Sequence, residues 1–116
     1  MQGAEELASG IQIKMLRAGD GEHYPQQSQS VAIHYEAFLP GGQMWDSSKA
    51  RKQPLRFRIA TGQVISGLDQ AVSQLSIGSR AKVLIPPELA YGERGFPGLV
   101  PPNTAIEFDV EILEII

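Results

Sequence analysis

Apolar and polar residues alternate with a period of two along five separate stretches of this chain. The stretches are residues 11–16, 30–39, 55–60, 81–85 and 106–112. Because successive side chains of a strand point to opposite faces, each stretch is typical of a strand with one buried and one solvated face. Antiparallel sheets are the ones that keep one face in water. The alternation therefore predicts a mostly antiparallel sheet.

Turn residues separate these stretches, and one further strand is predicted after a turn. The sequence Pro40-Gly41-Gly42 ends the second stretch, and residues 44–46 begin a return strand. Residues 47–54 are polar and basic, which indicates a loop. We therefore expect five or six strands.

Only one segment has helical periodicity. An apolar stripe begins at Leu68 and recurs four and seven residues later. Ser66 and Asp69 have the spacing of a capping box, and Gly78 is placed to end the helix in the left-handed conformation. A helix this short cannot cover a flat sheet, so we expect a sheet that bends around it. The predicted fold class is α+β.

Length and composition limit the organisation of the chain. With 116 residues it is long enough for a single hydrophobic core. We expect one domain over residues 10–116 and a flexible lead-in over residues 1–9. The N-terminal segment lacks the basic and apolar regions of a signal peptide, and no apolar run reaches the length of a membrane span. We therefore expect no membrane association.

Several kinds of chemistry are poorly represented. The chain has no cysteine, which excludes disulfides and thiolate chemistry and fits a reducing, cytoplasmic compartment. Its two histidines, His23 and His34, have neither the spacing of a metal site nor a Gly-x-Ser-x-Gly nucleophile motif beside them. His34 lies on the polar face of its strand, where a hydrogen-bonding role is the more common one. We expect no metal and no cofactor.

A basic cluster follows the return strand. It comprises Lys49, Arg51, Lys52, Arg56 and Arg58. Such a cluster is usually a solvated surface, although it can also contact a phosphate or an acidic partner. Because the net charge is −3, we do not expect nucleic acid to be the partner.

The segment from Tyr91 to Asn103 is an unusual loop. It is long, rich in glycine and proline, and carries aromatic and aliphatic side chains. Connecting loops are usually short and polar, so this one indicates the rim of an apolar cavity. Aromatic residues lie on or beside several predicted strands: Tyr35, Trp45, Phe57, Tyr91 and Phe108. Their patterning supports an apolar ligand pocket and leaves the ligand open.

The motifs of the chain resemble those of the FKBP family, the immunophilin prolyl isomerases that bind tacrolimus and rapamycin. The resemblance covers residues 10 to 116 in order and rests on His34-Tyr35, Trp45-Asp46-Ser47-Ser48, Val64-Ile65-Ser66-Gly67, Ala90-Tyr91-Gly92, Pro97-Gly98-Leu99-Val100-Pro101-Pro102-Asn103-Thr104 and Phe108-Asp109-Val110-Glu111. It implies an antiparallel half-barrel around one short helix. It also implies peptidyl-prolyl cis–trans isomerase activity without a cofactor and a role in protein folding. Nothing in the sequence demands more than a monomer, so a monomer is what we expect.

The resemblance further implies a set of site residues. The pocket would be lined by Tyr35, Trp45, Asp46, Phe57, Val64, Ile65, Leu68, Tyr91 and Phe108. The amide of Ile65 and the hydroxyl of Tyr91 would donate hydrogen bonds to carbonyl groups of a proline-containing peptide or a macrolide. Asp46 and Arg51 would form a polar wall, and Phe96, Leu99 and Val100 would form the rim.

The chain departs from the family pattern at three of these positions. Leu68 stands where many members have tryptophan, and Trp45 stands where many have phenylalanine. We expect a reshaped pocket and weaker macrolide binding. Phe96 replaces a commonly polar rim residue, so we expect a preference for bulky apolar clients. The alternative function is a non-catalytic module that docks a proline-containing partner in the same pocket.

Overall fold

A curved antiparallel sheet and one short α-helix make up the computed structural model, which describes all residues from 1 to 116. The elements in chain order are β1 (Glu5–Glu6), β2 (Gln12–Arg17), β3 (Ser30–Phe38), β4 (Met44–Ser47), β5 (Leu55–Arg58), α1 (Ser66–Val72), β6 (Arg80–Ile85), the 3₁₀ turn η1 (Pro87–Leu89) and β7 (Ile106–Ile115). The α+β half-barrel expected from the sequence is confirmed.

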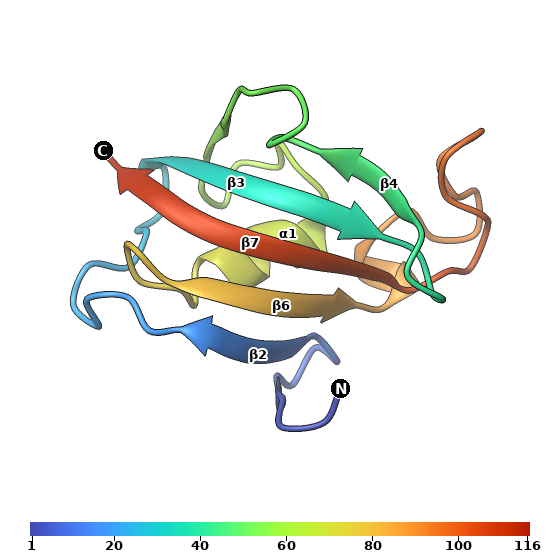
Figure 1. Cartoon of the computed structure of the whole chain (residues 1–116), viewed down its shortest axis with the longest axis horizontal. Coiled ribbons are helices and arrows are strands. Elements are labelled where there is room, and N and C mark those ends of the chain that lie inside the picture. The colour runs from blue at the N-terminus through green and yellow to red at the C-terminus, as the bar shows by residue number, and fades with distance from the viewer.

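The strands lie in the order β1-β2-β6-β7-β3-β4, all antiparallel (Figure 1). Strand β3 is long enough to pair with two partners on its far side. Its first half pairs with β5 and its second half with β4. The seventh strand, which the sequence pattern did not indicate, is the two-residue β1 within the expected lead-in.

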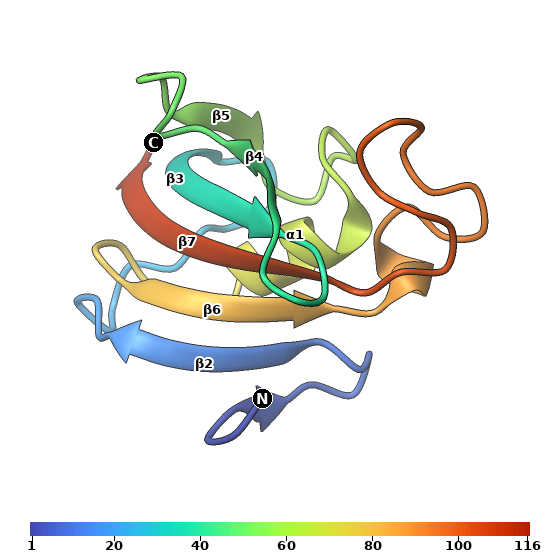
Figure 2. The same ribbon diagram turned by 45° about the vertical axis from the view of Figure 1, so that its right-hand side comes forward.

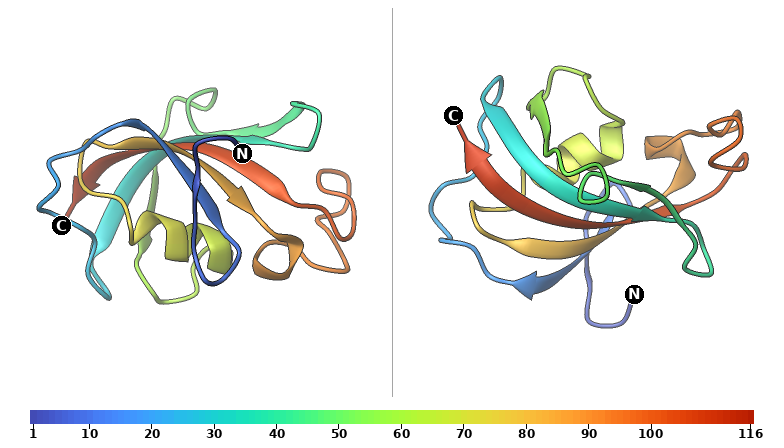
Figure 3. Two further views of the ribbon diagram at one scale, coloured as in Figure 1. Left: turned by 90° about the horizontal axis from the view of Figure 1, so that it is seen from below. Right: turned by 45° about the horizontal axis from the view of Figure 1, so that its top comes forward.

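The sheet curves around α1, which packs against its concave face (Figures 2 and 3). The predicted apolar stripe is buried: Leu68 and Val72 of α1, and Leu75 just after it, are at most 3% exposed. Strand residues such as Ile33 and Val83 are fully buried opposite it. Each such side chain contributes roughly 1.5–3 kcal/mol by leaving water. The alternation of the strands therefore encodes the core between sheet and helix.

Gly67 explains how closely the helix approaches the sheet. A Cβ atom at this position would lie 2.3 Å from Cγ2 of Ile85 on β6 and 3.0 Å from the Leu89 carbonyl oxygen. Only glycine fits this contact without displacement of its neighbours. The first turn of α1 is thereby held against β6 and η1.

The predicted helix ends are wrong at both termini. Ile65 occupies the N-cap position, and no side chain caps the helix. The Asp69 carboxylate instead accepts a hydrogen bond of 2.8 Å from the Ala60 amide, in the loop before the helix. The helix ends at Val72, so Gly78 does not terminate it. Gly78, with φ of +86°, forms the turn before β6.

No helix of the structure combines the length and the apolar character needed to cross a bilayer.

Candidate functional site

A cavity of about 300 Å³ opens between the start of α1, the inner face of the sheet and the segment after η1. Its lining is predominantly apolar and comes from seven parts of the fold. The lining residues are Tyr35, Trp45, Asp46, Leu55, Gln63, Val64, Ile65, Leu68, Tyr91 and Phe108. Leu68, in the first turn of α1, is 3% exposed and closes the cavity on the helix side.

Aromatic rings form one continuous chain along the cavity. The Tyr35 and Phe108 ring centroids are 5.7 Å apart, and those of Phe108 and Trp45 are 6.4 Å apart. Trp45 in turn lies 5.8 Å from Tyr91 and 6.3 Å from Phe96. These contacts are edge-to-face, an arrangement that aromatic pairs favour. Rings from β3, β4, β7 and the 91–103 loop therefore share one site.

The remaining residues expected in the site have other positions. Phe57 is 4% exposed and packs in the core, outside the cavity lining. Val100 is also buried in the core and forms an isolated β-bridge with Phe96. Leu99 is 43% exposed on the loop that carries Phe96. Of these two loop residues, Val100 therefore points into the protein and Leu99 lies at its surface.

Leu55 and Gln63 line the cavity but were not among the expected residues. In the sequence, the alternation of Leu55 with Arg56 indicated that the Leu55 side chain faces inward, but not that it reaches the cavity. The Gln63 side chain accepts a hydrogen bond of 2.8 Å from the Arg58 amide, a contact that only the folded loop creates.

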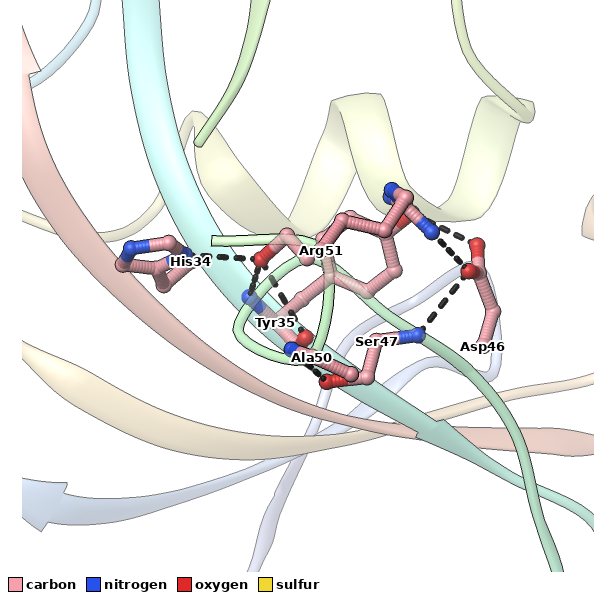
Figure 4. Close-up of polar contacts among 7 residues, drawn as sticks. His34, Tyr35, Asp46, Ser47, Ala50 and Arg51 are labelled. Carbon is pink, nitrogen blue, oxygen red and sulfur yellow. Dashed lines mark hydrogen bonds and ion pairs between the residues drawn. The ribbon is translucent and has the colours of Figure 1, made fainter. Parts of the chain in front are cut away.

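A polar wall stands on one side of the cavity (Figure 4). The Tyr35 hydroxyl donates to the Asp46 carboxylate at 2.6 Å and accepts from the Arg51 guanidinium at 2.8 Å. Arg51 also forms an ion pair with Asp46, so the three groups make a closed triangle. The guanidinium is 5.8 Å from the centroid of the Tyr35 ring.

A buried serine supports this wall from behind. Ser48 is fully buried, and its hydroxyl oxygen accepts from the Tyr35 amide at 2.7 Å. The same oxygen is 2.9 Å from Nδ1 of His34, which confirms a hydrogen-bonding role for that histidine. Two adjacent residues of β3 are therefore tied to the start of the β4–β5 loop.

The triangle fixes the charge states of its members. Burial would by itself raise the pKa of Asp46, but hydrogen bonds from Tyr35 and Arg51 outweigh it and hold that pKa below its ordinary value. Burial, and then donation to Asp46, raise the pKa of Tyr35. At neutral pH the wall therefore carries a carboxylate, a guanidinium and a neutral phenol.

Three hydrogen-bond donors around the cavity lack an acceptor within the chain. The Ile65 amide makes no backbone hydrogen bond. The Tyr91 hydroxyl has none either, and burial, followed by the charge of Asp46, raises its pKa, so it keeps its proton. The indole Nε1 of Trp45 is buried and unpaired. Ile65 and Tyr91 are only partly buried, whereas the indole N–H of Trp45 is enclosed by protein atoms without an acceptor.

Other depressions on the surface are less suited to chemistry. Two larger ones, each of about 470 Å³, lie beside the N-terminal segment and beside residues 22–29. Neither contains a cluster of aromatic rings or the polar triangle. The structure contains no group of three His, Asp or Glu side chains arranged to bind a metal ion.

The structure is therefore an α+β half-barrel with a cavity lined by aromatic rings and flanked by a polar triangle. Residues 21–113 match the family of FKBP-type peptidyl-prolyl cis-trans isomerases. The isomerase Fkbp12 of Drosophila melanogaster is 46% identical over 106 residues, which are 91% of this chain and 98% of the fly protein. FK506-binding protein 1 of Candida glabrata is 46% identical over 112 residues, covering 97% and 98% of the two chains.

Among solved structures, FkpA from Escherichia coli matches with a TM-score of 0.89 and 36% identity. The match covers 99% of this chain and 52% of FkpA, so the chain spans about half of that protein. The chain belongs to the FKBP-type peptidyl-prolyl cis-trans isomerase family, as the motif resemblance predicted. Its activity is the isomerisation of peptidyl-prolyl bonds.

Proposed function

We propose that isomerisation takes place in the cavity walled by Tyr35, Trp45, Tyr91 and Phe108, with the prolyl ring of the substrate above Leu68. The observation that carries the proposal is the convergence of these rings on two unpaired donors, the Ile65 amide and the Tyr91 hydroxyl. These donors bind carbonyl oxygens on either side of the prolyl bond. Asp46 and Arg51 hold Tyr35 in place and keep the polar wall rigid.

The reaction requires no proton transfer from the groups of the site. Rotation about the peptide bond is opposed by about 18–20 kcal/mol because amide resonance is lost on twisting. Resonance places charge on oxygen, and water favours that separated form. A dry cavity therefore penalises the planar ground state more than the twisted transition state. Shortening tens of seconds to tens of milliseconds requires only about 4 kcal/mol.

The same cavity is a candidate receptor for macrolides. Relatives of this chain carry the name FK506-binding protein 1, and the free donors suit ligand carbonyl groups. Leu68 and Trp45 change the floor and wall relative to many family members. We propose that FK506 binds in competition with substrate and that its affinity is reduced.

Cellular context is part of the proposal. We propose that the protein acts as a monomer on proline-containing proteins during folding. The absence of cysteine supports a cytoplasmic location. Light scattering after gel filtration tests the monomer directly.

The decisive experiment is cis–trans exchange of a Leu-Pro peptide, followed by NMR without a coupled protease, with and without FK506. Tyr91→Phe keeps the ring and removes one hydrogen bond of about 0.5–1.5 kcal/mol, so kcat/KM should fall about three- to tenfold. Tyr24→Phe is the matched control, because Tyr24 is 40% exposed and lies outside the cavity lining. Tight peptide binding with exchange at the uncatalysed rate would assign the cavity to docking instead.

A further inference from the structure

Positive charge is concentrated in one part of this chain. Residues 47–68 contain five of the ten lysines and arginines and none of the thirteen acidic residues. This segment therefore carries a charge of +5, while the rest of the chain carries −8. The five cations define a basic surface: Lys49, Arg51, Lys52, Arg56 and Arg58. All five are exposed.

The protein neutralises only part of this basic surface. Arg51 pairs with Asp46, and Arg56 lies 3.2 Å from the Glu114 carboxylate, with both partners about half exposed. Lys49, Lys52 and Arg58 form no ion pair. A positive field therefore extends into solvent from this side of the molecule.

The basic surface adjoins the catalytic cavity. A further depression, of about 460 Å³, is lined by Arg51, Gln53, Pro54, Leu55 and Arg56. Leu55 lines both this depression and the cavity, so the two are adjacent. In Figure 2 the β4–β5 loop, which carries Lys49 and Lys52, projects from the edge of the sheet.

The 91–103 loop, at the other end of the molecule in Figure 2, has a different character. Phe96 and Leu99 are each at least 40% exposed on the 91–103 loop. A peptide whose proline occupies the cavity therefore passes an apolar rim on one side and a cationic surface on the other. The arrangement is complementary to a segment that is apolar on one side of its proline and acidic on the other.

We propose that the basic surface is a subsite for acidic side chains and that the preferred clients carry carboxylates close to the isomerised proline. The inference rests on the proposed location of catalysis in the adjacent cavity. The subsite adds attraction and orientation rather than a catalytic group. Nucleic acid is a poorer occupant, because the remainder of the chain is strongly acidic and repels a long polyanion.

The test is a series of short Leu-Pro peptides in which one glutamate is moved from position to position on either side of the proline. Each peptide has a glutamine counterpart, and kcat/KM is measured by NMR exchange at low and high salt. At one side of the proline, glutamate should exceed glutamine by about threefold, as expected for exposed charge pairs. The advantage should disappear at about 0.5 M salt, where screening is strong.

Variants locate the effect. Lys49→Gln/Lys52→Gln should abolish the glutamate advantage and leave turnover of the glutamine peptides unchanged. Lys49→Glu/Lys52→Glu should reverse the preference toward lysine-flanked peptides. Lys14→Gln/Lys82→Gln is the charge-matched control, because these two residues form no ion pair and face each other across β2 and β6.

The outcomes separate the two proposals. Absence of turnover with the glutamine peptides would overturn the catalytic cavity itself. Normal turnover with no glutamate advantage at any position would overturn the acidic subsite alone. The subsite would also be overturned if the basic-surface variants lost affinity for a short RNA but kept the full glutamate advantage.

Discussion

At the scale of single residues, Trp45 is the most informative side chain. Its ring contacts Tyr91, Phe96 and Phe108, yet its indole N–H is buried without an acceptor. An unpaired buried donor costs about 1–3 kcal/mol. The chain therefore keeps a destabilising group in a residue that lines the cavity.

Trp45→Phe should leave the stability of the free protein nearly unchanged. The smaller ring loses packing contacts, but the unpaired donor is lost with it, so the free energy of unfolding should change by less than about 1 kcal/mol. Trp45→Leu removes the same donor together with the aromatic contacts, and should cost more. Urea unfolding monitored by circular dichroism measures both. If Trp45→Phe were as unstable as Trp45→Leu, loss of the unpaired donor would not offset the lost packing contacts.

Asp46 gives the site a defined response to acid. Its folded pKa lies below the ordinary value of about 3.9, so as pH falls the unfolded chain takes up the proton first. The stability contributed by the triangle is therefore present above that ordinary value. It is lost as pH falls toward the lower, folded pKa.

Urea unfolding between pH 6 and pH 2.5 tests this response. Wild type should lose more stability across the acid range than Asp46→Asn, whose side chain cannot titrate. Above about pH 5 the difference between the two proteins should be constant. Parallel curves throughout would show that Asp46 has the same pKa in both states.

At the scale of elements, the contact between α1 and β6 determines where the cavity floor lies. Gly67 permits this contact, and Ile65 and Leu68 flank it at the helix start. Any shift of the helix away from β6 would displace both residues from the cavity.

Gly67→Ala should destabilise the protein although alanine is the better helix former. The propensity gain is about 1 kcal/mol, but the added Cβ would lie 2.3 Å from the Ile85 side chain. Overpacking of this kind typically costs about 1–3 kcal/mol, so the net effect should be a loss of stability and of isomerase activity. Gln70→Ala, on the exposed face of α1, should stay within about 0.5 kcal/mol of wild type. A stabilised Gly67→Ala would show that α1 has room to move.

At the scale of the whole molecule, the cavity exists only in the folded chain, because its walls come from β3, β4, β5, β7, α1 and two loops. A ligand of the cavity therefore binds the native state alone. Linkage then predicts stabilisation of about 2.7 kcal/mol when free ligand is a hundredfold above its dissociation constant.

Titration with FK506 should raise the midpoint of thermal unfolding progressively and change the fluorescence of Trp45, the only tryptophan. Tyr91→Phe should require more ligand for the same shift. Binding detected by calorimetry with no change in emission would contradict the position assigned to Trp45. Tyr24→Phe, which lies outside the cavity lining, should show the same shift as wild type.

Much of this architecture follows from local patterning. Period-two alternation specifies the strands because a sheet with one wet face must separate apolar from polar residues in just this way. Tyr35 and Phe108 were assigned to the site by family motifs, and the structure brings them into edge contact. The prediction of a capping box was wrong because the Asp69 carboxylate accepts instead from the Ala60 amide, nine residues earlier in the chain.

The sequence by itself determined the fold class, the buried face of most strands and the family, because these depend on local periodicity and ordered motifs. Only the tertiary structure decided which aromatic rings share a cavity: Phe57 lies in the core, whereas Leu55 reaches the site. It also decided that Arg51 closes a triangle with Tyr35 and Asp46 and that a basic surface adjoins the cavity. Such features depend on sheet curvature and on contacts between distant residues, which no local pattern encodes.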